Sequence, residues 1–276
     1  MVARVQTVAF QGIEAVPVDV QAQITSGLPP GVVIVGLPDK AIKEAGERVK
    51  AALISSGLSL PPRRIVVNLA PADLPKEGSH YDLPIALALM ATIGAFPADA
   101  LDGYVAIGEL GLDGRLARVD GVLPAAIAAH GRDLGIICPA PSGPEAAWAG
   151  DDIEIVAPET LLALVNHLGG YQLCPRPVPR RRELAAGLPD LGDVRGQEVA
   201  RRALEVAAAG GHNLLMVGPP GSGKSMLAQR LPSILPPLDP RELLDVSMIA
   251  SIAGELAGGA LSDRRPFRAP HHSASM

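Results

Sequence analysis

The first 170 residues alternate between short apolar runs and segments in which apolar residues recur every three or four positions. Alternating or continuous apolar runs predict strands, and the three-and-four spacing predicts helices with one buried face. The predicted strands are residues 16–24, 31–36, 64–69, 104–107, 135–138 and 153–156. The predicted helices are residues 40–56, 83–93, 122–130 and 159–168, the first with Asp39 as N-cap and Gly57 just beyond its end. This order predicts one α/β domain over residues 1–170.

A change of composition follows this predicted domain. Pro175, Pro177 and Pro179 stand close together and favour an extended backbone, so residues 171–190 are interpreted as an interdomain linker. The basic run 180–182 is interpreted as a solvated charge run beside a domain boundary, with contact to a nucleic-acid backbone as the alternative.

The remaining residues, 191–276, form a second predicted domain. A helix is predicted after Glu198, and the apolar run 213–217 predicts a buried parallel strand. A second helix is predicted over residues 226–231. Between the strand and this helix lies a glycine-rich loop, which is the context in which phosphate-binding loops occur.

This loop fills every position of the pattern G-x-x-x-x-G-K-[ST]. Its residues are Gly218, Pro219, Pro220, Gly221, Ser222, Gly223, Lys224 and Ser225. Glycines allow a left-handed backbone whose N–H groups converge on phosphate oxygens. In such a loop the lysine ammonium binds the β and γ phosphates, and the serine hydroxyl is a ligand to Mg²⁺. The loop therefore predicts binding of ATP with Mg²⁺, with Ser225 as the metal ligand.

Amino-acid composition narrows the possible classes of protein but does not indicate a function. Hydrophobic residues make up 48% of the 276-residue chain, aromatic residues 3%, and the formal charge is −5. With so few aromatic residues, few side chains can stack on nucleic-acid bases. The negative net charge argues against extensive binding of a polyanion over the surface. Two cysteines, Cys138 and Cys174, predict reduced thiols rather than a disulfide framework. No run of about 20 apolar residues and no export signal are visible, so we expect a cytoplasmic protein without a membrane span.

Two groups of motifs resemble known families. Residues 196–197, 208–215 and 265–275, together with the phosphate loop, resemble the magnesium-chelatase-like AAA+ ATPases. The segment from Asn68 to Pro84, with 27–29 and 35–38, resembles the ComM (YifB) family in particular. The resemblance spans the chain and implies a Lon-protease-like N-terminal domain before an ATP-driven ring motor. It also implies a homo-oligomer, a hexamer, that acts on DNA by branch migration during natural transformation.

The Lon resemblance raises a serine-lysine protease as an alternative. Alignment without gaps places His80 where the nucleophilic serine belongs, with Ser79 one position away, and places Leu123 at the lysine position. Leucine cannot act as a general base, so proteolysis is not favoured. Ser79, His80 and Asp82 are interpreted instead as turn and helix-cap residues before a packed helix.

The sequence after the loop lacks the acidic strand end that normally completes a Mg²⁺–nucleotide site. The later acidic residues are Asp239, Glu242, Asp245, Glu255 and Asp263, and none follows an apolar strand. His271 and His272 are adjacent without further ligands, which favours a structural role over a metal site. We therefore expect that the chain ends within the motor domain, that no catalytic residue is present and that ATP turnover is slight. A non-catalytic module for oligomerisation or partner binding remains the other alternative.

Overall fold

The computed structural model describes residues 2–97, 99–181 and 189–270. The chain divides into two compact units. The first unit comprises Met1–Arg181 together with Ser247–Ala260, and the second comprises Arg182–Val246 together with Leu261–Met276. The first unit therefore includes a short segment from far along the sequence, which no sequence pattern indicates.

The first unit is built on a mixed sheet of seven strands, ordered β3-β4-β2-β1-β5-β8-β9. Their bounds are β1 Ala3–Gln11, β2 Glu14–Thr25, β3 Gly31–Val35, β4 Arg64–Ala70, β5 Tyr104–Ala106, β8 Gly135–Ile137 and β9 Ile155–Val156. β1–β2 and β2–β4 pair antiparallel, whereas the other four neighbouring pairs are parallel. The α/β fold class is confirmed by this mostly parallel sheet.

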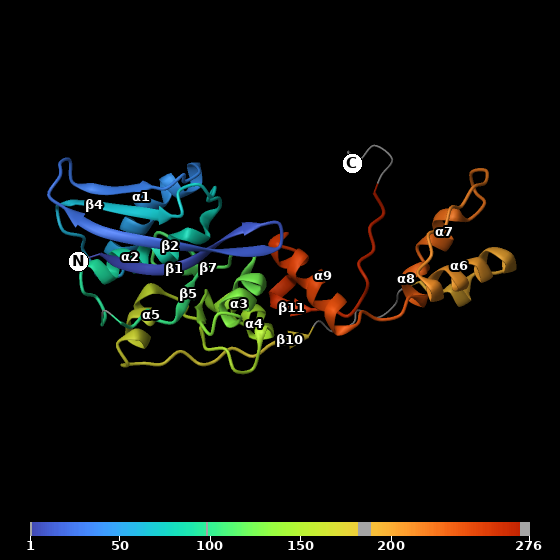
Figure 1. Cartoon of the computed structure of the whole chain (residues 1–276). Helices are drawn as coiled ribbons and strands as arrows, with labels where there is room; N and C mark the ends of the chain where they lie inside the picture. Colours follow the sequence, from blue (N-terminus) through green and yellow to red (C-terminus); the bar gives the residue numbers. More distant parts are fainter. Residues whose placement is uncertain (1, 98, 182–188, 271–276) are drawn as a thin grey trace. The chain divides into compact units, whose positions relative to one another are not determined.

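Helices cover the two faces of this sheet unequally (Figure 1). The helices are α1 Lys40–Ser55, α2 Asp82–Thr92, α3 Val122–His130, α4 Gly143–Ala146 and α5 Leu161–Leu168. α1, α2 and α5 share one hydrophobic core with the inner positions of β1, β2 and β4, while α3 and α4 share another with β5, β8 and β9. The β5-β8-β9 end is therefore covered on both faces, as expected for parallel strands.

Local sequence signals explain most of these elements. Asp39 caps α1, since its carboxylate accepts a 2.8 Å hydrogen bond from the Ile42 N–H. Gly57 lies just past the helix with φ 78°, as predicted for its C-terminal stop. The first strand, β1, was not predicted, and neither was the short hairpin of β6 Glu109–Leu110 and β7 Leu116–Ala117. β1 lies at the centre of the sheet between β2 and β5.

The second unit contains short helices around a small core. Its helices are α6 Glu198–Gly210, α7 Lys224–Ala228 and α8 Leu231–Ile234, and α9 Pro240–Ile252 begins there and ends among the residues of the first unit. Leu191, Val194, Leu204 and Leu227 form the core. The helix expected at 226–231 is thus replaced by α7, which begins two residues earlier, and by α8. β10 Arg180–Arg181, of the first unit, and β11 Ala260–Leu261 are strands of two residues each.

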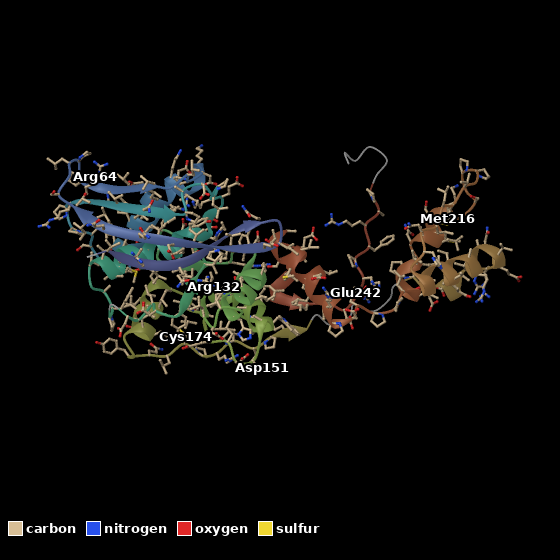
Figure 2. The ribbon with its side chains drawn as sticks, in the orientation of Figure 1. Arg64, Arg132, Asp151, Cys174, Met216 and Glu242 are labelled. Atoms are coloured by element: carbon tan, nitrogen blue, oxygen red, sulfur yellow. The ribbon has the colours of Figure 1, made fainter. Side chains whose placement is uncertain are left out.

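The strand predicted at 213–217 is wrong. These residues have no regular secondary structure, and the side chains of Leu215 and Val217 are each 87% exposed. A cavity of about 720 Å³ adjoins the run and is lined by Leu204, Leu214, Met216 and other apolar side chains; Figure 2 marks Met216. A strand forms only where a neighbour accepts its backbone hydrogen bonds, and no described strand of the second unit lies next to this run. Hydrophobicity alone therefore does not produce the strand.

Candidate functional site

The glycine-rich loop at residues 218–225 leads directly into helix α7. Gly221 and Gly223 have φ values of 81° and 85°, the left-handed conformation that glycine adopts at least cost. Gly223 is the residue immediately before the helix, whose first residue is Lys224. The predicted loop residues are therefore brought together in one turn, and the two glycines supply the backbone reversal that a phosphate cradle needs.

The ammonium group of Lys224 lies over this turn. Its Nζ donates hydrogen bonds to the carbonyl oxygens of Gly218 at 2.7 Å and Pro219 at 2.8 Å, and lies 3.2 Å from Ser222 Oγ. Those acceptors are weaker partners for a cation than phosphate oxygens. Ser225 is exposed on the first turn of α7 and is accessible for a hydroxyl–metal contact. The residues present fit a triphosphate with Mg²⁺ at this turn.

Contacts from the rest of the second unit hold the loop. Gln197 Nε2 donates to the Ser222 carbonyl at 3.4 Å, and Arg230 Nε donates to the Asp190 carbonyl at 3.1 Å. Leu227 of α7 is buried in the small core with Leu204. The loop therefore contacts the residue just before α6, and the segment that follows α7 is joined to Asp190.

The acidic residues after the loop make other contacts. The carboxylate of Asp239 caps α9 by accepting from the N–H groups of Arg241 at 2.9 Å and Glu242 at 2.8 Å. Glu242, marked in Figure 2, accepts two hydrogen bonds from Arg265, at 3.0 and 2.7 Å. This pairing lowers the pKa of Glu242. Within the described residues, no group of three His, Cys, Asp or Glu side chains is placed to hold a metal ion; His271 and His272 lie outside them.

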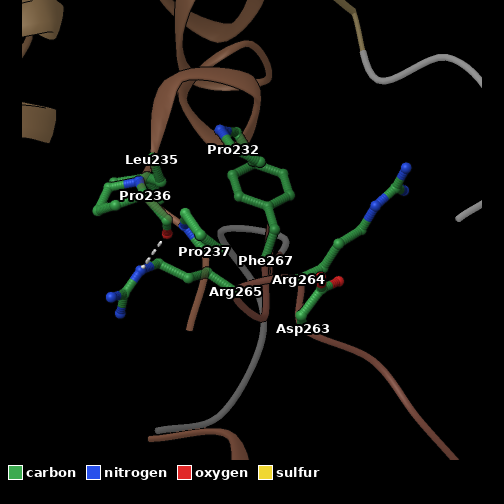
Figure 3. Close-up of a pocket in the computed structure, with 8 residues that line it drawn as sticks. All are labelled: Pro232, Leu235, Pro236, Pro237, Asp263, Arg264, Arg265 and Phe267. Atoms are coloured by element: carbon green, nitrogen blue, oxygen red, sulfur yellow. Dashed lines mark hydrogen bonds between the residues drawn. The ribbon is translucent and has the colours of Figure 1, made fainter. Parts of the chain in front are cut away.

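Arg265 also borders a pocket of about 420 Å³ in the second unit (Figure 3). Its guanidinium Nε donates to the Pro236 carbonyl at 2.9 Å, and the Phe267 ring lies beside Pro232. The proline and phenylalanine side chains make the lining mostly apolar. No sequence motif had indicated this pocket.

A second cavity lies in the first unit, around the segment that resembles the Lon active site. Its volume is about 210 Å³, and its lining includes Phe10, Ser79, Glu109, Arg118 and Ile252. Ser79 and His80 form a short 3-10 turn before α2, as the sequence predicted for this segment. Ile252 is the last residue of α9, so the distant segment of the sequence forms one wall of the cavity.

The cavity lacks a serine-lysine arrangement. Ser79 Oγ donates a hydrogen bond to Glu109 Oε2, and the Leu123 side chain is fully buried at the position where a lysine base would be needed. Lys76 is buried as well, and its Nζ donates to the Pro71 carbonyl. The geometry therefore offers no amine to activate Ser79.

Asp82 differs from its predicted role as a helix cap. It is the first residue of α2, and its buried carboxylate accepts from Arg48 Nε at 3.0 Å and Nη2 at 2.9 Å. The Leu110 N–H donates to the same group at 3.3 Å. Burial raises the pKa of Asp82, and the hydrogen bonds from Arg48 oppose that shift. This ion pair joins α1 to α2, a connection between residues 34 positions apart that local sequence could not indicate.

Known proteins similar to this chain include the family that its sequence motifs resemble. Residues 20–142 match the family described as subunit ChlI of Mg-chelatase, and residues 190–276 match the family described as magnesium chelatase, subunit ChlI. The "Uncharacterized protein YifB" of Escherichia coli is 43% identical over 272 residues, which cover 99% of this chain and 53% of YifB. The "Competence protein ComM" of Haemophilus influenzae is 41% identical over 273 residues, which cover 97% of this chain and 53% of ComM.

An α/β unit followed by this glycine-lysine loop defines the class as magnesium-chelatase-like. Within that class the chain belongs to the ComM/YifB family, since its identity to YifB and ComM extends over nearly all of its residues. The chain spans about half the length of these curated relatives. Among the described residues, no helix has both the length and the apolar character needed to cross a bilayer.

The buried imidazole beside the cavity predicts a pH dependence of stability. His80 packs between the rings of Phe10 and Tyr81, with its Nε2 3.0 Å from the Val8 carbonyl oxygen. Burial lowers the pKa of His80 from 6.5 to about 4. Between those values the unfolded chain binds more protons than the folded one, so acidification favours unfolding. We expect His80 alone to lower the unfolding free energy of the first unit by about 3 kcal/mol between pH 6.5 and 4.

Denaturant unfolding followed by the fluorescence of Trp148, the chain's one tryptophan, measures this loss. His80→Gln removes the titrating group while keeping a polar side chain, so its stability should fall much less over the same pH range. His130→Gln, the same substitution at a partly exposed histidine, is the comparison variant. Equal pH dependence in the wild type and His80→Gln would contradict the assignment.

Proposed function

We propose that the loop 218–225 binds ATP with Mg²⁺ and that the protein is an ATP-dependent motor of the ComM type. The observation that carries this proposal is the position of Lys224, whose ammonium lies over a turn with two left-handed glycines at the start of a helix. Phosphate oxygens supplied there can replace the carbonyl acceptors of the ammonium. The match of residues 190–276 to magnesium chelatase subunit ChlI supports the same conclusion.

Each loop residue has a defined part in this proposal. The backbone N–H groups of residues 221–225 cradle the phosphates, and Lys224 neutralises charge on the terminal phosphates. The Ser225 hydroxyl would supply one ligand to Mg²⁺, and the bound ion would neutralise phosphate charge. Asp239 and Glu242 are occupied in capping and in the Arg265 pair, so neither completes the metal shell. We therefore infer that this chain binds nucleotide and turns it over slowly.

Binding by the Lys224→Ala variant tests the central part of the proposal. Isothermal titration of the 276-residue chain with Mg-ATP should show binding that weakens by at least about tenfold in Lys224→Ala, because a charge-assisted hydrogen bond to phosphate is lost. Lys40→Ala is the control, since Lys40 lies on the exposed side of α1 and its side chain is 92% exposed. The wild type should bind ATP more tightly with Mg²⁺ than with EDTA. Ser225→Ala should reduce this difference in affinity.

Absence of Mg-ATP binding by the wild type, or equal affinity in Lys224→Ala, would overturn the nucleotide proposal. A Mg²⁺-dependent ATPase rate that disappears in Lys224→Ala would instead support binding and refute the inference of slow turnover. The two measurements therefore separate the nucleotide site from the catalytic claim.

The DNA part of the proposal rests on family membership and on the name of the competence relative. We propose that the protein assembles as a ring, a hexamer, and remodels branched DNA during transformation. Fluorescence anisotropy with a labelled three-way junction should show binding by this chain that weakens as salt rises, because phosphate contacts release counterions. No binding at low salt, with or without Mg-ATP, would contradict a DNA contact by this chain and leave nucleotide binding untouched.

The first unit is better suited to binding than to catalysis. Proteolysis needs an amine beside Ser79, and the structure places Glu109 there. A non-catalytic module for partner binding is favoured by the buried contacts that this unit makes with a segment from late in the sequence.

A further inference from the structure

Residues 247–260 pack against one face of the first unit through specific polar contacts. The face is formed by residues 118–121, the first residues of α3 and helix α4. The segment comprises the end of α9 and the glycine-rich turn that follows it. In Figure 1 this part of α9 lies beside α3 and α4. We refer to residues 247–260 as the docked segment.

The first contact is centred on a buried carboxylate. Glu145 of α4 is fully buried, and its Oε1 accepts a 2.5 Å hydrogen bond from Ser251 Oγ of the docked segment. The same oxygen accepts from the Leu123 N–H at 3.1 Å, which orients the carboxylate toward Ser251. Ser251 is itself fully buried. A buried carboxylate requires such donors, because its desolvation is costly when it is unpaired.

Two further hydrogen bonds bind backbone carbonyls of the docked segment. The Gly121 N–H donates to the Ser251 carbonyl at 3.1 Å. Arg118 Nη2 donates to the Leu256 carbonyl at 2.5 Å, and its guanidinium lies 4.0 Å from Glu145 Oε2. Donors from outside α9 thus bind two backbone carbonyls, one in the last turn of this helix and one beyond its end.

Glycines of the docked segment lie where side chains would not fit. Gly259 has φ 69°, and a Cβ added to it would lie 2.7 Å from the backbone nitrogen of Glu145. A Cβ added to Gly254 would lie 3.0 Å from both carboxylate oxygens of Asp120. Because glycine has no Cβ, it allows another part of the backbone to approach closely. The neighbouring Gly258 has a similar φ of 62° and no atom within 4 Å of the added Cβ.

We propose that this face of the first unit is a receptor for residues 247–260 and that Glu145 and Arg118 recognise the docked segment. Its ligand is therefore the carboxyl-terminal end of a helix that presents a serine hydroxyl, two backbone carbonyls and a turn of glycines. Docking also places Ile252 as a wall of the cavity around Ser79 and Glu109. The first unit, which lacks a protease dyad, thus acts as a binding module for a segment of its own chain. This inference does not depend on nucleotide binding.

Replacement of the two neighbouring glycines tests the proposal in the full chain. Gly259→Ala and Gly258→Ala introduce the same left-handed backbone strain, but only the first places a methyl group against α4. Hydrogen exchange of the Gly121 amide and of residues 249–256 measures docking directly. We expect at least tenfold faster exchange in Gly259→Ala, while Gly258→Ala stays close to the wild type.

A second pair of variants examines the buried carboxylate. Ser251→Ala removes the hydrogen bond to Glu145, and Ser247→Ala, at a buried serine one turn earlier on α9, is its matched control. We expect severalfold faster exchange at Gly121 in Ser251→Ala alone. Trp148 fluorescence verifies that the first unit remains folded in each variant. The proposal would be overturned if amide exchange rates were equal in Gly259→Ala and Gly258→Ala and also equal in Ser251→Ala and Ser247→Ala. This holds whether the two members of a pair are both fast or both slow.

Discussion

Backbone hydrogen bonding decides which apolar runs of this chain become strands. In the first unit, β2 and β4 pair along their full common length, and β3 extends the sheet on the far side of β4. In the second unit, the equally apolar run 213–217 has no described neighbour and remains irregular, with Leu215 and Val217 exposed. Because the phosphate loop follows this run directly, its left-handed glycines and α7 are supported by the small core around Leu204 and Leu227 instead of by a sheet.

Elements whose signals are local could be predicted from the sequence. The periodicity and caps of α1 and the apolar length of α3 located those helices to within a residue, and the loop pattern brought Lys224 and Ser225 to one turn. The features that were missed or misassigned depend on partners that are distant in the sequence. β1 was missed although it lies at the centre of the sheet, and Asp82 pairs with Arg48 from another helix instead of capping its own. The Glu145–Ser251 bond joins residues 106 positions apart, beyond the reach of any local pattern.

The first unit carries both the cavity around Ser79 and the face that binds the docked segment. Its cavity retains Ser79, but Glu109 is the partner of that hydroxyl, and the position expected for a lysine base holds a buried leucine whose N–H orients Glu145. The backbone at the position where the Lon resemblance would place a lysine therefore contributes to holding the docked segment. Helix α9 begins in the second unit and ends in the first, so one helix belongs to both units.

The central claim is that residues 218–225 form a phosphate-binding turn even though the preceding run is not a strand. Amide hydrogen exchange across residues 213–225, with and without saturating Mg-ATP, tests it most directly. The account predicts fast exchange throughout without nucleotide and clear protection of the amides of residues 221–225 when Mg-ATP is added, because those N–H groups donate to phosphate. Unchanged exchange at residues 221–225 in saturating Mg-ATP would contradict it.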